Sequence, residues 1–282
     1  MTLPRLVSAL MTFLFALTPS TVFPGASWAQ SPSASPTPQK EQDTGPAEGQ
    51  DDQHPGFDSA QAIDKLVEQL KKTWPNNRNL RVVFHGHSVP AGYFRTPEVR
   101  RWDSYPMLFY QRLCQTYSTA TIDLSVTAIG GENSEQGAQR FQEDVLSLKP
   151  DLVFIDYSLN DRRIGLEKAE LAWRKMIQAC HVQGVPVVLL TPTPDSREDI
   201  TDPSTPLADF SAQVQRLGDD YQVPVIDAYG RFRKEVADGK DLQTFLSQSN
   251  HPNRDGHQLV SDLIWEWWLD QDPPSSAPAP TP

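Results

Sequence analysis

Residues 80–92 read LRVVFHGHSVPAG, a short apolar run followed by a polar turn. The β-branched run from Leu80 to Phe84 is typical of a strand buried on both faces of a parallel sheet. The run stops at Gly86, and Ser88 follows two residues later. Open α/β sheets bind ligands at the carboxyl ends of their strands. Ser88 is therefore a candidate nucleophile, although an ordinary polar loop between a strand and a helix would carry the same residues.

Beyond this stretch, segments with strand patterns alternate with segments of helical spacing. After the first strand we expect strands at 121–128, 152–157, 185–191 and 223–227. Helices are expected at 59–73, 104–113, 133–148, 166–182, 207–221, 231–237 and 255–269. This alternation predicts parallel β-α units with right-handed crossovers. The expected fold class is α/β, a three-layer α/β/α sandwich around a mostly parallel five-stranded sheet.

The first 29 residues have the pattern of a cleavable secretory signal peptide. Arg5 is their only charge, and an apolar stretch from Leu6 to Leu17 follows it. Small residues, Ser27 and Ala29, stand at the −3 and −1 positions of a cleavage site before Gln30. We expect an exported protein, secreted or periplasmic, with no stable membrane span after processing. An uncleaved N-terminal anchor is the alternative.

Two further segments lack the apolar side chains that a packed core needs. Residues 30–56 are rich in Ser, Pro, Gln and acidic residues, and 273–282 form a tail of Pro, Ala and Ser. Such compositions cannot bury enough surface to offset the entropy of ordering, so both are expected to be disordered. One folded domain is left at 57–272, which is long enough for one substantial core.

The composition also excludes several function classes. A formal net charge of −11 without a basic stripe argues against a nucleic-acid partner. The turn at 86–90 lacks the glycine spacing of a dinucleotide or phosphate loop, so no nucleotide cofactor is expected. Cys114 and Cys180 lack the spacing of a metal site. Each cysteine follows a different strand in a helical pattern, and these helices should cover opposite faces of the sheet. We therefore expect two unpaired, buried thiols. Neither a metal nor a cofactor is expected.

Four polar features are expected in loops that meet at one edge of the sheet. They are Ser88, Gly130-Gly131, Asn160 and His251. Serine becomes a nucleophile when an adjacent base such as histidine accepts its proton. Backbone N–H groups and an Asn amide could stabilise the oxyanion that acyl transfer develops. Taken alone, Asn160 could simply be part of a turn, and His251 could belong to a rigid turn before the last helix.

In these four blocks the sequence resembles the SGNH (GDSL-type) hydrolases, over roughly Val82 to Leu263. The blocks are Gly86-His87-Ser88, Gly130 or Gly131, Ser158-Leu159-Asn160-Asp161 and the segment 248–253, QSNHPN. The resemblance implies a flavodoxin-like SGNH fold and a serine esterase that works through an acyl-enzyme. It implies Ser88 and His251 as catalytic residues. It also implies an oxyanion hole made by Ser88, Gly130 or Gly131, and Asn160.

The chain departs from the family pattern at three positions. His87 replaces the Asp of Gly-Asp-Ser, and Ser158 replaces the Gly of Gly-x-Asn-Asp. Gln248 replaces the Asp that orients the catalytic histidine in the family. Gln248 brings no charge, and loss of that charge can cost orders of magnitude in rate. Gln248, His87 and Asp161 are candidates to orient His251 or to support the site around it. Otherwise a backbone carbonyl or another carboxylate holds His251, giving a Ser-His dyad, or the enzyme is slow.

The expected function is hydrolysis of carboxylic esters by an exported enzyme, with an O-acetylated carbohydrate or a small ester as the substrate. A lipase or lysophospholipase is the alternative within the enzyme class. A catalytically weak SGNH-fold protein that binds glycans is the alternative outside it. The loop at 93–102, with its arginines and aromatic residues, is a candidate lining for the acyl or sugar site.

Overall fold

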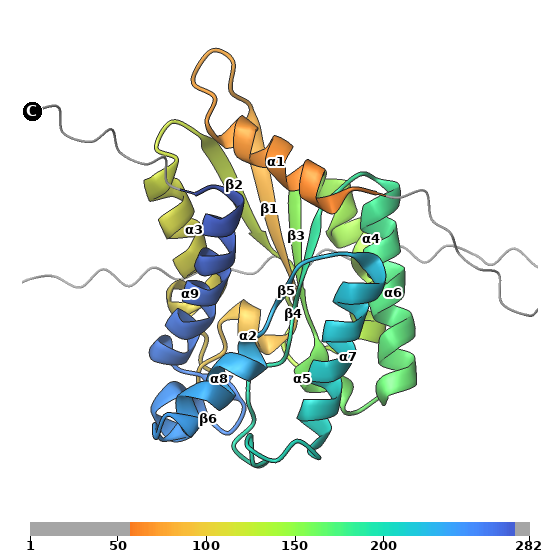
Figure 1. Cartoon of the computed structure of the whole chain (residues 1–282), viewed down its shortest axis with the longest axis vertical. Helices are drawn as coiled ribbons and strands as arrows, with labels where there is room; N and C mark the ends of the chain where they lie inside the picture. Colours follow the sequence, from red (N-terminus) through yellow and green to blue (C-terminus); the bar gives the residue numbers. More distant parts are fainter. Residues whose placement is uncertain (1–56, 274–282) are drawn as a thin grey trace, which may run out of the picture. The chain divides into compact units, whose positions relative to one another are not determined.

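The computed structural model describes residues 57–273, which form a sheet covered by helices on both faces (Figure 1). Five parallel strands lie in the order β2-β1-β3-β4-β5, the arrangement expected of a doubly wound α/β fold. Their bounds are β1 Asn79–Gly86, β2 Thr121–Val126, β3 Leu152–Asp156, β4 Val187–Leu190 and β5 Val225–Ile226. The predicted α/β/α sandwich with a five-stranded parallel sheet is confirmed.

The helices divide into two layers, one on each face of the sheet (Figure 1). One core packs α1 (Ser59–Leu70), α3 (Tyr105–Thr116), α8 (Ala228–Ala237) and α9 (Arg254–Gln271) on one face. The other packs α4 (Ser134–Asp144), α6 (Leu166–Val182) and most of α7 (Pro206–Tyr221) on the opposite face. Side chains alternate accordingly along the strands. Phe84 and Phe154 stack at 4.3 Å between centroids in the first core, and Val83 and Val153 lie in the second.

Short elements lie in the connections between strands and helices, all of them at the carboxyl edge of the sheet except η2, which precedes the start of β3 at the amino edge. They are α2 (Ser88–Ala91), α5 (Ser158–Asp161), the 3₁₀ turns η1 (Arg101–Asp103), η2 (Leu146–Leu148) and η3 (Leu242–Phe245), and a hairpin of β6 (Leu246–Gln248) and β7 (His251–Pro252). The sequence did not predict the hairpin, because two strands of two or three residues are too short for a pattern.

Several helix ends differ from the sequence prediction. The helix expected at 59–73 ends at Leu70, and the helix expected at 104–113 continues to Thr116. The helix expected at 133–148 ends at Asp144 and resumes as the 3₁₀ turn η2. The helix expected to begin at Arg231 begins at Ala228, because the Asp227 carboxylate accepts a hydrogen bond from the Gly230 N–H at 3.0 Å and caps it.

Both cysteines are unpaired, as predicted, on helices that cover opposite faces of the sheet. Cys180 is buried, but Cys114 is only half-buried and lines a surface cavity along α3, so the prediction of a buried thiol is wrong for Cys114. Within residues 57–273, no helix is both long and apolar enough to cross a membrane. The predicted signal peptide, linker and most of the tail lie outside the described residues.

Candidate active site

Ser88 stands at the point where β1 turns into the short helix α2. Gly86 ends the strand with no room for a side chain, because a Cβ there would lie 2.4 Å from the carbonyl oxygen of Asp156. His87 caps α2, and Gly92 ends it with a φ of +89°, a backbone conformation that favours glycine. The tight turn therefore places Ser88 at the carboxyl edge of the sheet, where it is 6% exposed.

His251 reaches Ser88 from the far end of the chain. It lies on β7, held by antiparallel pairing with Gln248 on β6. Asn253 then starts α9 by accepting hydrogen bonds from the N–H groups of Asp255 and Gly256. The Nε2 atom of His251 lies 2.9 Å from Ser88 Oγ, across 163 residues of sequence. This is the distance at which a histidine can accept the proton of a nucleophilic serine.

The environment of His251 keeps its imidazole neutral. Burial lowers the pKa of His251, the electrostatic influence of the neighbouring His87 lowers it further, and the nearby Phe94 carbonyl acts in the opposite direction. A base with a pKa below 6.5 is free of its proton at neutral pH. Its other nitrogen, Nδ1, is buried and has no partner of good hydrogen-bond geometry within residues 57–273.

Gln248 does not occupy the position of a histidine-orienting acid. Its Oε1 accepts the Thr96 N–H at 3.0 Å, and its Nε2 lies 3.4 Å from Asn250 Oδ1. The side chain thus ties the hairpin to the loop that follows α2. The group in this loop that raises the pKa of His251 is the Phe94 carbonyl, and the Gln248 amide does not contribute.

Ser247 makes the second tie between the hairpin and this loop. Its hydroxyl lies 2.7 Å from the Phe94 carbonyl oxygen and 3.0 Å from the His251 carbonyl oxygen. The Arg95 Nε–H donates to the Ser247 carbonyl at 2.9 Å. Ser247 is therefore placed to fix the Phe94 carbonyl relative to His251. No pattern in the sequence predicted these contacts of Ser247.

The N–H groups expected to form an oxyanion hole are available for hydrogen bonding. In the part of the chain that the structure describes, the backbone N–H groups of Ser88, Gly130 and Gly131 have no acceptor. Gly131 has a φ of +80° in the turn closed by the Glu132 N–H to the Ile129 carbonyl. Asn160 is 5% exposed and uses its Nδ2 to donate to the Glu132 carbonyl at 2.8 Å. That leaves one N–H on the same amide.

Tyr93 is a site residue that sequence reasoning placed only within a general loop. A Cβ on Gly130 would lie 2.7 Å from the Tyr93 ring, so the ring rests directly on this glycine. The Tyr93 ring centroid is also 5.9 Å from that of His251. The half-buried tyrosine therefore lies between the Gly130 turn and His251.

Asp161 supports the loops rather than His251. Its buried carboxylate accepts the Ser134 N–H at 2.7 Å and the Trp173 Nε1–H at 2.8 Å. Burial raises the pKa of Asp161 to about 6. The carboxylate thus joins α5 to the start of α4 and to α6, which fixes the position of its neighbour Asn160.

His87 belongs to a buried polar chain beneath Ser88. Its Nδ1 accepts the Val89 N–H at 3.2 Å, and its Nε2 lies 3.3 Å from Asp156 Oδ1, a close contact without hydrogen-bond geometry. The other Asp156 oxygen accepts the Tyr105 O–H at 2.9 Å. In the sequence, the one signal of this buried polar network is Asp156, a charged residue at the end of an apolar strand.

A second buried network lies under the Gly130-Gly131 turn. The Tyr157 hydroxyl donates to Glu132 at 2.8 Å, and Arg140 pairs with the same carboxylate. His85 lies 3.1 Å from this hydroxyl, and burial lowers the pKa of His85 to about 3. Within residues 57–273 no group of three or more His, Cys, Asp or Glu is arranged to hold a metal ion.

Comparisons with known proteins agree with the arrangement of Ser88 and His251 described above. The model of the GDSL-like lipase/acylhydrolase family matches residues 84–259, more than half of the chain. A search of curated proteins finds no match. Among solved structures, a two-domain esterase active on acetylated mannans, co-crystallised with mannopentaose, is 21% identical with a TM-score of 0.64. The match covers 78% of this chain but only 56% of that one.

Two other solved structures are similar over nearly their whole length. The acetyl xylan esterase AlAXEase is 26% identical with a TM-score of 0.57, over 67% of this chain and 99% of that one. Axe2, an acetylxylan esterase from Geobacillus stearothermophilus, is 19% identical with a TM-score of 0.57, over 68% and 93%. The family match and the fold confirm the resemblance seen in the sequence: the chain belongs to the GDSL-like lipase/acylhydrolase (SGNH hydrolase) family.

Proposed function

We propose that this esterase removes acetyl groups from O-acetylated carbohydrate through an acyl-enzyme on Ser88. The observation that carries the proposal is the 2.9 Å contact between Ser88 Oγ and His251 Nε2 at the carboxyl edge of the sheet. The structural neighbours that act on acetylated mannan and acetylated xylan favour this substrate class over others in the family.

Acylation begins when Ser88 Oγ attacks the ester carbonyl carbon and His251 Nε2 takes the hydroxyl proton. The negative charge that develops on the carbonyl oxygen is met by N–H groups of Ser88, Gly130 or Gly131, and Asn160. The bond from the carbonyl carbon to the sugar oxygen then breaks. His251 returns its proton to that oxygen, and the deacetylated sugar leaves.

Deacylation repeats these steps with water. A water molecule attacks the acetyl-Ser88 carbonyl while His251 removes one of its protons. The tetrahedral intermediate collapses, acetate leaves, and the proton passes from His251 to Ser88 Oγ. The lowered pKa of His251 suits both half-reactions, because the imidazole starts each of them unprotonated.

The catalytic unit that we propose is a Ser-His dyad whose histidine faces a backbone carbonyl. Nδ1 of His251 has no carboxylate among its partners in the described part of the chain. The Phe94 carbonyl raises the pKa of His251 and is held by Ser247 at 2.7 Å. Catalytic hydrogen bonds are often long or poorly aligned in unliganded enzymes and tighten once substrate is bound. A carbonyl at Nδ1–H would keep the proton off Nε2, the tautomer that the reaction needs.

The surroundings of Ser88 favour a short acyl group. Ser88 is almost buried, and the Tyr93 ring borders it by resting on Gly130 and facing His251. An acetyl group needs little space beside the nucleophile, whereas a long acyl chain would have to displace this ring. Export through a cleaved signal peptide is part of the same proposal, because acetylated polysaccharides lie outside the cell.

Rates on p-nitrophenyl acetate, butyrate and octanoate, together with acetate release from acetylated mannan and xylan, test the proposal. We expect the rate to fall with acyl length and acetate to be released from at least one polysaccharide. Ser88→Ala should lower the rate by ~10³-fold or more, since the serine and histidine act as a unit. Equal rates in wild type and Ser88→Ala would contradict the nucleophile. Preference for octanoate would indicate a lipase, and no turnover by folded protein would indicate the glycan-binding alternative.

A further inference from the structure

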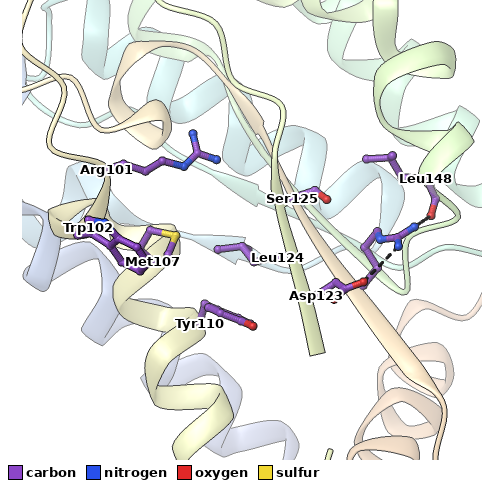
Figure 2. Close-up of a pocket in the computed structure, with 9 residues that line it drawn as sticks. Arg101, Trp102, Met107, Tyr110, Asp123, Leu124, Ser125 and Leu148 are labelled. Carbon is purple, nitrogen blue, oxygen red and sulfur yellow. Dashed lines mark hydrogen bonds and ion pairs between the residues drawn. The ribbon is translucent and has the colours of Figure 1, made fainter. Parts of the chain in front are cut away.

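A groove follows the outer edge of the sheet, where β2 has no neighbouring strand among the described residues. Its central cavity, of about 560 Å³, lies between β2 and the η1–α3 segment (Figure 2). The main lining residues are Arg101, Trp102, Tyr110, Asp123, Leu124 and Ser125. We call this surface the β2-edge groove.

The central cavity continues into a neighbour at each end. A cavity of about 580 Å³ shares Arg101 and Ser125 with it and reaches Ile129. Another of about 550 Å³ shares Trp102 and runs along α3 to Gln115. Beyond the end of β2 the pairing with β1 continues through the Thr127 N–H to Phe84 and the Ile129 N–H to Gly86. At ~3.3 Å per residue, the six steps from Asp123 to Ile129 span up to about 20 Å. The groove is therefore long enough for several units of a chain-like ligand.

One end of the β2-edge groove meets the loops of the candidate active site. The Ile129 N–H donates to the Gly86 carbonyl at 3.0 Å, and the Gly130-Gly131 turn follows directly. Arg101 packs its backbone against Gly92, where a Cβ would lie 2.9 Å from the Arg101 Cα. Both ends of the α2 segment that carries Ser88 thus touch residues that line the groove.

The chemistry of the groove suits a neutral ligand rich in hydroxyl groups. Trp102 leaves its indole 79% exposed, a flat apolar face with an N–H donor at its edge. Arg101 extends toward the cavity (Figure 2), and its guanidinium has no partner within residues 57–273. The other charge in the central cavity is compensated, because Arg81 pairs with Asp123 at 3.2 Å. An exposed aromatic face beside free donors, with little net charge, favours sugar rings over lipid chains or polyanions.

We propose that the β2-edge groove binds unmodified sugar units of a neutral polysaccharide whose acetylated unit lies at Ser88. This inference rests on the proposed function and adds a site for the chain beyond the reacting sugar. Trp102 stacks on a sugar ring, and Arg101 and the free backbone edge of β2 bind hydroxyl groups. The groove thereby selects polymers over small acetyl esters.

Titration calorimetry with mannopentaose and xylopentaose on the Ser88→Ala protein tests the inference without turnover. We expect at least one pentaose to bind, and Trp102→Ala in this background to weaken binding roughly tenfold, the usual cost of truncating a central aromatic contact. Trp102→Phe should recover part of the affinity. Trp74 is a matched control, since it is 84% exposed and lies outside the groove, so Trp74→Ala should bind like its parent.

Two results would overturn the inference: no binding of either pentaose at millimolar concentration, or equal affinity in the parent and Trp102→Ala. Circular dichroism of each variant checks that the fold is intact. Labelling of wild-type Ser88 by a fluorophosphonate separates this failure from failure of the proposed function. A protein that is labelled but binds no pentaose lacks only the glycan site, whereas one that binds a pentaose but is never labelled lacks the proposed catalysis.

Discussion

Ser247→Ala removes the hydroxyl that fixes the Phe94 carbonyl beside His251. This hydroxyl lies 2.7 Å from the Phe94 carbonyl oxygen, 3.0 Å from that of His251 and 3.3 Å from that of Pro252. The side chain is nearly buried, so water does not readily replace it. The substitution leaves Ser88, His251 and the oxyanion donors unchanged.

The expected effect has two parts. A buried carbonyl left without a donor costs ~1–3 kcal/mol, which should appear as a lower free energy of unfolding. Release of the Phe94 carbonyl also loosens the imidazole, and we expect kcat/KM on p-nitrophenyl acetate to fall by roughly 10- to 100-fold, equivalent to about 1.4–2.7 kcal/mol. Because this carbonyl raises the pKa of His251, the acidic limb of the pH–rate profile should move to lower pH.

Gln248→Ala is the matched control on the same short strand. It removes an exposed hydrogen bond to the Thr96 N–H, so kcat/KM should fall by only about two- to fivefold. Were Gln248 the group that orients His251, its loss would resemble loss of an orienting acid, about 10⁴-fold. A loss of that size in Gln248→Ala, with full activity in Ser247→Ala, would refute the carbonyl dyad.

Three further outcomes are expected. Asn160→Ala should lower kcat by ~10²–10³-fold with little change in KM, because the amide acts on charge that develops in the transition state; a change confined to KM would contradict that role. The rate should rise with pH through an apparent pKa below 6.5 and be level by about pH 7.5, because burial and the nearby His87 lower the pKa of His251; a limb centred above 7 would show a different base. Unfolding by urea at pH 8 and pH 5 should show lower stability at pH 5. His85 and His257 have folded-state pKa values of about 3, so at pH 5 each binds a proton only in the unfolded state. Each therefore lowers the free energy of unfolding at pH 5 by about 2 kcal/mol. Asp161, with a folded-state pKa of about 6, opposes this by about 1 kcal/mol, and stability that is equal at both pH values would contradict the neutral burial of the two histidines.

Periodicity and order along the chain were enough to predict the sheet and the loops that carry the site. Strands buried on both faces leave continuous apolar runs such as Leu80–Phe84, and parallel connection brings their carboxyl ends to one edge. Because Ser88 and His251 each lie in a connection at that edge, their positions in the sequence predicted that they would meet despite the 163 residues between them.

The partners of His251 could not be predicted in the same way. Gln248 stands where the family pattern has an acid, yet its amide binds the Thr96 N–H, because β6 pairs with β7 and directs this side chain to the loop after α2. The contribution of Phe94 is a backbone carbonyl, which leaves no trace in residue identity. A position relative to a motif predicts a role only where the local backbone also matches.

Buried polar networks were missed for a related reason. Asp161 was a candidate to support His251, but its carboxylate binds the Ser134 N–H and the Trp173 indole. Asp156 and Tyr105 meet below His87, although 51 residues separate them in the sequence. Which buried donor finds which acceptor depends on how helices pack on the sheet, and hydrophobic spacing says nothing of that choice.

The central claim is that Ser88 is a nucleophile activated by His251. Intact-protein and peptide mass spectrometry after treatment with a fluorophosphonate tests it most directly, because the probe forms a stable bond only with an activated serine. We expect a single adduct on the peptide that contains Ser88, absent in Ser88→Ala and strongly reduced in His251→Ala. No adduct on folded wild-type protein, or an adduct that persists in Ser88→Ala, would contradict the account.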